Sequence, residues 1–328
     1  MWKKSLEFWA RRQTPITLIF LVLSILFPLV FPQRYIVSIG VMCGIYVLLS
    51  LSMNLITGYL GIVVLGQAAF YGIGAYTAAI LSTRLGWGFL PNLLAAALLC
   101  ALAGIIISSP ALRLKGSYLS IVTLGFCEII RIVELNWIGL TRGPYGITSI
   151  PPPALFGFQI SSIRGYYYLI LAMCCLAAIL IANLTNSRIG RSFAAIKGDE
   201  VAAQSMGINI FRTKLIGFAI SAAIAGTAGA FYAQYMSYVD STTFTADQSF
   251  QILGMTILGG LGNIPGSVLG AISMTVLPEL LRGVAEYRQI IYGLIIAIMV
   301  IVKPEGILGG FRLKQIRQFK QHQTRRDS

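Results

Sequence analysis

Long apolar runs alternate with short polar segments along the 328 residues of the chain. An α-helix rises 1.5 Å per residue, so about 20 apolar residues cross a hydrocarbon core about 30 Å thick. The pattern predicts helices at roughly 15–32, 35–56, 63–83, 90–109, 117–137, 166–184, 213–236, 249–261, 265–282 and 286–303. The run at 249–261 is too short for a full crossing, so we expect a half-helix that dips into surrounding protein. The sequence thus predicts an all-α polytopic membrane protein with eight to ten transmembrane helices, and we favour ten.

The distribution of basic residues predicts the orientation of the chain. Lys and Arg accumulate in the cytoplasmic loops of membrane proteins. With an even number of crossings, 18 of the 25 basic residues fall in cytoplasmic segments, six in outer loops and one, Arg131, inside a crossing. The net charge of +14 therefore indicates topology and gives no reason to expect a nucleic-acid partner. We predict a single transmembrane domain over 1–328, with cytoplasmic tails at 1–14 and 304–328, a periplasmic loop at 138–165 and a cytoplasmic loop at 186–212.

The composition excludes several classes of protein. Charged residues make up 11% of the chain, against about 25% in a soluble domain, and the mean hydropathy is +0.79. The sequence contains no paired catalytic carboxylates, no Ser/His/Asp set and no G-x-x-x-x-G-K-[ST] phosphate loop. The five cysteines lie in apolar runs without ligand spacing, so we expect neither a disulfide nor a metal site. We therefore expect no enzyme activity and no cofactor in this chain.

Small residues recur every four positions along one predicted helix, at Gly217, Ser221, Ala225, Gly229 and Ala233. Small side chains let helix backbones approach closely in a membrane. The repeat predicts close packing of this helix against its neighbours. Helices that slide on one another during transport are the alternative.

Three charged residues stand at three-residue intervals in one predicted crossing, Glu128, Arg131 and Glu134. Neighbours at this spacing can pair along a helix flank, and intramembrane charges are costly enough to be functional candidates. Glu128 and Arg131 are therefore either a structural ion pair or a contact for a transported solute. Glu134 stands near Trp137, so we expect it at the outer interface.

The longest polar segment between apolar runs extends from Asn186 to Lys214. It predicts two short helices, at 191–197 and 200–206, each closed by a glycine, with Asp199 placed to cap the second. A short helix with few bulky side chains can sit in a groove of another protein. We interpret the segment as a docking element, with a plain interhelical loop as the alternative.

Four stretches of the chain match segments of one known family in the same order: GYLGIVVLGQAAFYGIGAY at 58–76, TRGPYGITSIP at 141–151, EVAAQSMGIN at 200–209 and ILGGLGNIPGSVLG at 257–270. They resemble, in turn, the early Gly-rich segment, an outer loop, the cytoplasmic coupling loop and the late Gly-rich segment of ABC importer permeases of the branched-chain amino-acid (Liv) type. The chain departs from that family at Gln67, where many members have His, and at Tyr145, where an acidic residue is common.

The resemblance implies a permease of the bacterial inner membrane that carries branched-chain or other neutral amino acids to the cytoplasm by alternating access. Independently, five crossings in each half would make the second half enter the membrane in the opposite direction, so we expect two inverted halves. The implied partners are a second, LivH-like permease, two ATPase subunits that bind ATP and Mg²⁺, a periplasmic solute-binding protein and the lipid bilayer. Leucine, isoleucine and valine are the default solutes, and urea, amides and other neutral amino acids stay open.

The resemblance also implies roles for particular residues. Those that would contact the ATPase are Arg191, Ala195, Gly198, Asp199, Glu200, Ala202, Ala203, Gly207 and Ile208. Ala202, Ala203 and Gly207 would allow close docking, while Asp199 and Glu200 would cap the helix or pair with basic groups of the ATPase. The pathway candidates are Gln67, Tyr71, Gly259 and Gly260. The alternative is a secondary transporter driven by an ion gradient, with Glu128 and Arg131 as its coupling pair.

Overall fold

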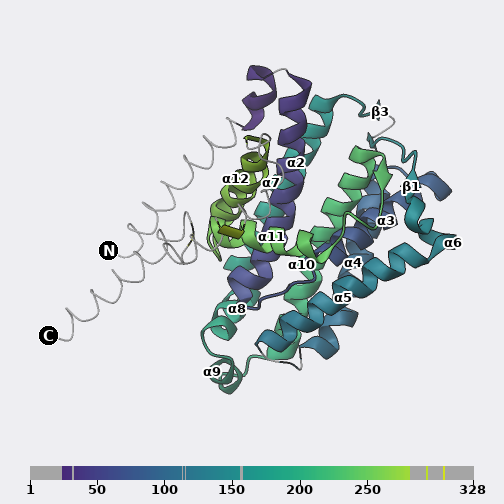
Figure 1. Cartoon of the computed structure of the whole chain (residues 1–328). Helices are drawn as coiled ribbons and strands as arrows, with labels where there is room; N and C mark the ends of the chain where they lie inside the picture. The colour runs from purple at the N-terminus through teal and green to yellow at the C-terminus, as the bar shows by residue number, and fades with distance from the viewer. Residues whose placement is uncertain are drawn as a thin grey trace.

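The computed structural model describes residues 24–31, 33–112, 114, 116–155, 158–280, 293–294 and 306. Helices account for most of this part of the chain (Figure 1). The long ones are α2 (Arg34–Met53), α3 (Gln67–Leu85), α4 (Phe89–Ala111), α5 (Ser117–Asn136), α7 (Ile163–Asn186), α10 (Ile210–Met236), α11 (Ala246–Gly259) and α12 (Ile264–Leu280). The short ones are α6 (Ile138–Thr141), α8 (Arg188–Gly198), α9 (Glu200–Ser205), the π-helix η1 (Asn54–Leu60) and the 3-10 helix η2 (Gly143–Tyr145).

Four helices of the described part are long and apolar enough to cross a membrane: α2 continued by η1, α4, α7 and α10. They have 27, 23, 24 and 27 residues, and at 1.5 Å per residue each exceeds a hydrocarbon core of about 30 Å. α3 and α5 have 19 and 20 residues but are less apolar, and α5 carries three charged side chains. The prediction of an all-α polytopic membrane protein is confirmed.

The predicted helices agree with the observed ones to within a few residues. The run predicted at 117–137 is α5, and the short run at 249–261 is α11, which has 14 residues. α11 follows a non-helical segment at 237–245, and its role as a half-helix that dips into surrounding protein stays a prediction. The crossing predicted at 286–303 lies outside the described residues apart from 293–294, as does most of the one at 15–32. The total number of crossings and the two inverted halves therefore stay predictions.

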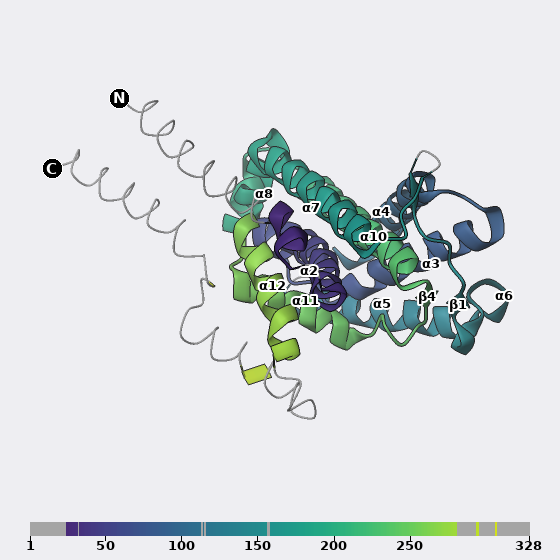
Figure 2. The same ribbon diagram turned by 90° about the horizontal axis from the view of Figure 1, so that it is seen from above.

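α10 lies between two groups of helices (Figures 1 and 2). It packs against α3 and α4 on one side and against α2 on the other, and α2 in turn contacts α7, α11 and α12. Small residues permit this close approach: Gly229 lies against the backbone of Tyr71, and Gly226 against Cys100. The close packing predicted from the four-residue repeat is thus confirmed, and large side chains such as Phe231 fill the core between the small ones.

Two small antiparallel sheets complete the described structure. β1 (Ile147–Thr148) pairs with β4 (Tyr238–Val239), and β2 (Ala154–Leu155) pairs with β3 (Phe158–Gln159). β4 follows the end of α10, whereas α9 precedes its start, so the two lie at opposite ends of that helix (Figure 1). We call these the β4 end and the α9 end of the bundle.

Candidate functional site

The polar segment between α7 and α10 forms two short helices, as its sequence predicted. α8 begins after Ser187, whose hydroxyl accepts a hydrogen bond from the N–H of Ile189 at 3.2 Å. Asp199 caps α9, because one of its carboxylate oxygens accepts bonds from the N–H groups of Val201 and Ala202 at 2.8 and 3.0 Å. A cap of this kind stabilises a helix by about 1 kcal/mol. It matters for α9, since a six-residue helix has little stability of its own.

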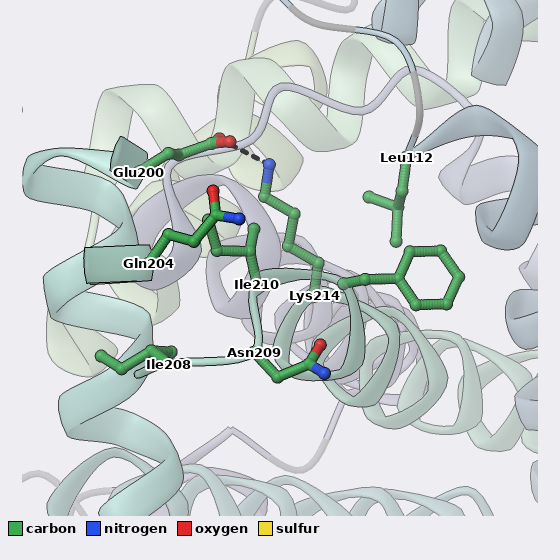
Figure 3. Close-up of a pocket in the computed structure, with 8 residues that line it drawn as sticks. Leu112, Glu200, Gln204, Ile208, Asn209, Ile210 and Lys214 are labelled. Carbon is green, nitrogen blue, oxygen red and sulfur yellow. Dashed lines mark hydrogen bonds and ion pairs between the residues drawn. The ribbon is translucent and has the colours of Figure 1, made fainter. Parts of the chain in front are cut away.

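An ion pair holds α9 against the first turns of α10. The ammonium of Lys214 lies 2.5 Å from Oε1 of Glu200, and the two side chains point toward each other in Figure 3. Lys214 is only 6% exposed, and a lysine at that depth is costly unless an anion neutralises it. Glu200 therefore pairs with a lysine of its own chain, whereas we expected it to cap α9 or to pair with the ATPase.

A cavity of 340 Å³ lies beside this ion pair. α9, the link to α10, the start of α10 and the end of α4 all contribute to its wall (Figure 3). Its lining residues are Leu112, Glu200, Gln204, Ile208, Asn209, Ile210, Phe211 and Lys214. The cavity has a polar wall at the ion pair and an apolar one formed by the leucine, isoleucines and phenylalanine.

The side chains of α9 divide between the interior and the surface. Ala203 is 3% exposed and packs into its own chain. It is therefore not available for docking, contrary to our expectation. Val201 and Met206 are 70% and 83% exposed, and Ala202 and Gly207 are exposed beside them. We call these four exposed residues the α9 face.

α8 is tied to η1 by Lys197, the residue before Gly198. Its ammonium donates a hydrogen bond to the carbonyl of Gly58 at 2.5 Å. Asn54, the first residue of η1, donates to the carbonyl of Asn263 at 3.2 Å and accepts from the N–H of Gly262 at 2.7 Å. π-helical turns are frequent at functional sites. These bonds connect α8, through η1, to the turn between α11 and α12.

The other residues of the predicted coupling loop have less specific environments. Arg191 and Gly198 are exposed, and Ala195 and Ile208 are partly buried. Their burial and exposure do not test whether these four residues contact an ATPase, so that contact stays a prediction.

Gln67, the first pathway candidate, is fully buried among hydroxyl groups. Its amide donates to the hydroxyl of Ser52 at 2.6 Å and to that of Ser221 at 3.2 Å. These bonds satisfy its amide nitrogen, whereas its amide oxygen has no hydrogen-bond partner among the described residues. In this conformation Gln67 joins three helices, α2, α3 and α10.

The other three pathway candidates are also buried. Tyr71 is 2% exposed and packs against the rings of Tyr232 and Phe244 in tilted and edge-on contacts. Gly259 lies backbone to backbone against Gly266, which joins α11 to α12, and Gly260 is buried beside it. In this conformation all three contribute to helix packing.

The three charges of α5 have two different environments. Nε of Arg131 lies 2.8 Å from Oε2 of Glu128, and their side chains are 31% and 37% exposed. Glu134 takes no part in that pair and is 5% exposed. Within the described part of the chain, neither of its carboxylate oxygens has a hydrogen-bond partner. The structure buries Glu134 within the bundle near the end of α5, against Gly72 of α3, and its place at the outer interface stays a prediction.

Residues 35–302 match the family described as the permease component of branched-chain amino acid transport systems. The chain belongs to this family. It is 37% identical over 311 residues to the high-affinity branched-chain amino acid transport permease LivM of Escherichia coli (strain K12), covering 88% of this chain and 73% of that protein. It is 25% identical over 316 residues to a probable LivM of Methanocaldococcus jannaschii (81% and 90% covered) and 24% over 287 residues to LivH of Escherichia coli (80% and 91%). No solved structure matches the chain.

The family membership confirms the resemblance that four short stretches indicated, since all four lie within the matched residues. Two features of the site were not foreseen. One is the partnership of Lys214, for which the only signal was a single lysine at the start of a long apolar run. The other is the isolation of Glu134, because its spacing from Arg131 is the same as that of Glu128.

Proposed function

We propose that this family member is a permease subunit of an ABC importer that carries branched-chain or other neutral amino acids into the cytoplasm by alternating access. A periplasmic binding protein would deliver the solute, and a second, LivH-like permease would complete the pathway. Two ATPase subunits would bind ATP and Mg²⁺ and drive the cycle. The similarity to both LivM and LivH supports the solute class and the pairing of two permeases.

The α9 face is the observation that carries this proposal. Val201 and Met206 project from a helix that Asp199 caps and the Glu200–Lys214 pair holds in place. Exposed apolar groups on a rigid support are typical of an interaction surface. We propose that the α9 face enters a groove of an ATPase subunit.

This assignment sets the orientation of the bundle. The α9 end would face the cytoplasm and the β4 end the periplasm, where loop 138–165 would meet the binding protein. The α8–α9 segment is rich in basic residues, as expected for a cytoplasmic loop. Its basic residues and those at the start of α10 are Arg188, Arg191, Lys197, Arg212 and Lys214.

The hydrogen bonds of Lys197 and Asn54 suggest how the ATPase would act on the solute pathway. Movement of α8 would shift the carbonyl of Gly58 and, through Asn54, the turn between α11 and α12. An ATP-driven cycle needs such a link between two states of the pathway.

The test replaces an exposed side chain of the α9 face. Met206→Asp puts a charge where we propose an apolar contact, and Tyr145→Asp is the matched control, since Tyr145 is also 83% exposed but lies at the β4 end. From native membranes we expect wild type and the control to retain an ATPase subunit and its ATP hydrolysis. Met206→Asp should lose both at unchanged membrane content. Equal ATPase recovery with both variants would contradict the proposal.

The competing secondary transporter makes a different prediction. Uptake would then collapse when the ion gradient is dissipated at constant ATP, and the chain would purify without an ATPase. An importer driven by ATP should continue uptake without the gradient and stop when ATP is depleted.

A further inference from the structure

Three buried oxygens at the β4 end of α5 and α3 have no hydrogen-bond partner in the described part of the chain. Two are the carboxylate oxygens of Glu134, and the third is the phenol oxygen of Tyr76. Glu134 is 5% exposed and Tyr76 is 4% exposed. A buried polar group without a hydrogen bond is strongly unfavourable, so these oxygens indicate a ligand that binds them in another state of the protein.

Phe244 lies with the Glu134 carboxylate against Gly72, and it is the centre of a group of aromatic rings. The ring of Phe244 lies 5.0 Å from that of Tyr71, 6.1 Å from that of Tyr76 and 6.2 Å from that of Tyr232, measured between centroids. All three contacts are edge-on, so the rings present differently oriented faces and edges to one another. Such a group of rings attracts a positively charged ligand through the negative faces of the rings.

Gly72 provides the space that the carboxylate occupies. A Cβ atom at this position would lie 2.6 Å from Oε1 of Glu134 and 3.0 Å from the ring of Phe244. Gly72 and Tyr76 are one helical turn apart on the same face of α3, so the carboxylate, the phenol and the ring converge over that face. Any larger residue at 72 would displace the carboxylate.

The chemistry of the group selects one kind of ligand. Calcium prefers six to eight oxygens and Mg²⁺ a full octahedron, and the described residues contain no cluster of three metal-ligating side chains. A carboxylate, one hydroxyl and aromatic faces instead suit an ammonium group, which donates hydrogen bonds and makes cation–π contacts.

We propose that Glu134 and Tyr76, together with the rings of Tyr71, Tyr232 and Phe244, bind the ammonium group of the amino acid during its passage. This assignment rests on the proposed importer function, because that function supplies the zwitterionic solute. The site is closed in the present conformation, and separation of α5 from α3 during alternating access would open it to the solute.

The test compares two isosteric changes on α5 in the complete importer. Glu134→Gln removes the charge of the buried carboxylate, and Glu128→Gln removes that of the carboxylate nearly two turns earlier, which is about one-third exposed. Leucine uptake is measured in proteoliposomes that contain the importer and its binding protein, with KM and maximal rate determined separately. A lost charge-assisted hydrogen bond predicts that Glu134→Gln raises KM by about ten- to a hundredfold, while Glu128→Gln changes it less than about twofold.

Further arms distinguish an ammonium group from an inorganic cation and from a purely structural carboxylate. Glu134→Asp keeps the charge and should recover part of the affinity, whereas Glu134→Gln with an unchanged KM would overturn the assignment. Replacing Na⁺ and K⁺ by N-methylglucamine should leave wild-type uptake unchanged, and a tenfold loss would assign the site to an inorganic cation instead.

Two outcomes of the experiment need separate treatment. If Glu134→Gln does not accumulate in the membrane, Tyr76→Phe tests the same site, with a higher KM expected and an unchanged KM contradicting it. Failure of wild type to couple leucine uptake to ATP would overturn the proposed function itself, which distinguishes the two failures.

Discussion

Lys214 and Glu134 are both buried charged residues near opposite ends of the bundle, and the chain treats them in opposite ways. Lys214 at the α9 end has Glu200 at 2.5 Å. Glu134 at the β4 end is equally deep but has no hydrogen-bond partner among the described residues. A protein normally pairs a charge that it buries. The difference therefore separates a charge used for structure, which stabilises a helix, from a charge left for a ligand.

The same contrast exists within a single helix. Glu128 and Glu134 both lie three residues from Arg131, yet only Glu128 pairs with it. The rotation of α5 turns Glu128 toward the surface and Glu134 toward Gly72 of α3. Partner choice on α5 is thus decided by helix packing and not by spacing along the sequence.

The largest effect is expected from Gly72→Leu, which would push a side chain into the position of the Glu134 carboxylate. A Cβ at residue 72 lies 2.6 Å from Oε1 of Glu134, so the carboxylate would be displaced and would lose its hydrogen bond to the solute, and solute affinity should fall by up to about a hundredfold. Leucine uptake in proteoliposomes measures it. Gly125→Leu on α5 is the control, since nothing lies within 4 Å of a Cβ there. Normal uptake with Gly72→Leu would show that Glu134 at the β4 end does not bind the solute, and the comparison with Lys214 would then fail.

A smaller effect is expected from Glu200→Ala at the α9 end. It leaves Lys214 buried without its anion, which costs about 3–5 kcal/mol for a fully buried pair. Because the Glu200 side chain is 41% exposed, we expect about 1–2 kcal/mol and a loss of up to about tenfold in solute-stimulated ATP hydrolysis. The charge reversal Glu200→Lys with Lys214→Glu should restore part of it. If the reversed pair is no better than Glu200→Ala, the bond does not position α9.

Most of the helical architecture could be predicted from the sequence because local properties determine it. Apolar runs located α5 and α11 to within a few residues. The cap of α9 was predictable too, since Asp199 is adjacent to the N–H groups that it binds.

Features that depend on tertiary packing could not be predicted in this way. The Glu200–Lys214 bond joins residues 14 positions apart across a turn whose path the sequence does not specify. Ala203 faces inward because that bond fixes the rotation of α9. The π-helical turn at η1 likewise depends on Asn54 reaching the turn between α11 and α12.

A further prediction concerns Asp199, whose carboxylate caps α9 and so is a second charge that stabilises structure at the α9 end. Asp199→Ala removes the acceptor of two N–H bonds and should cost about 0.5–2 kcal/mol, or about fivefold in coupled ATP hydrolysis. Asp199→Asn keeps a capping oxygen and is the matched control, with activity close to wild type. If both variants lose activity equally, the charge of Asp199 and not its cap is what matters, as would be the case if it met a basic group of the ATPase.

The smallest effect is expected from Arg131→Gln, the partner of Glu128. Both side chains are about one-third exposed, and ion pairs at this spacing on a helix surface contribute about 0.3–0.5 kcal/mol. Leucine uptake should therefore change less than about twofold, and ion-gradient dependence should not appear. A loss comparable with that of Glu134→Gln would mean that Arg131 also reaches Glu134 in another conformation. In that case the carboxylate would have a partner within the chain, and the contrast between the two ends of the bundle would apply to one state of the transport cycle only.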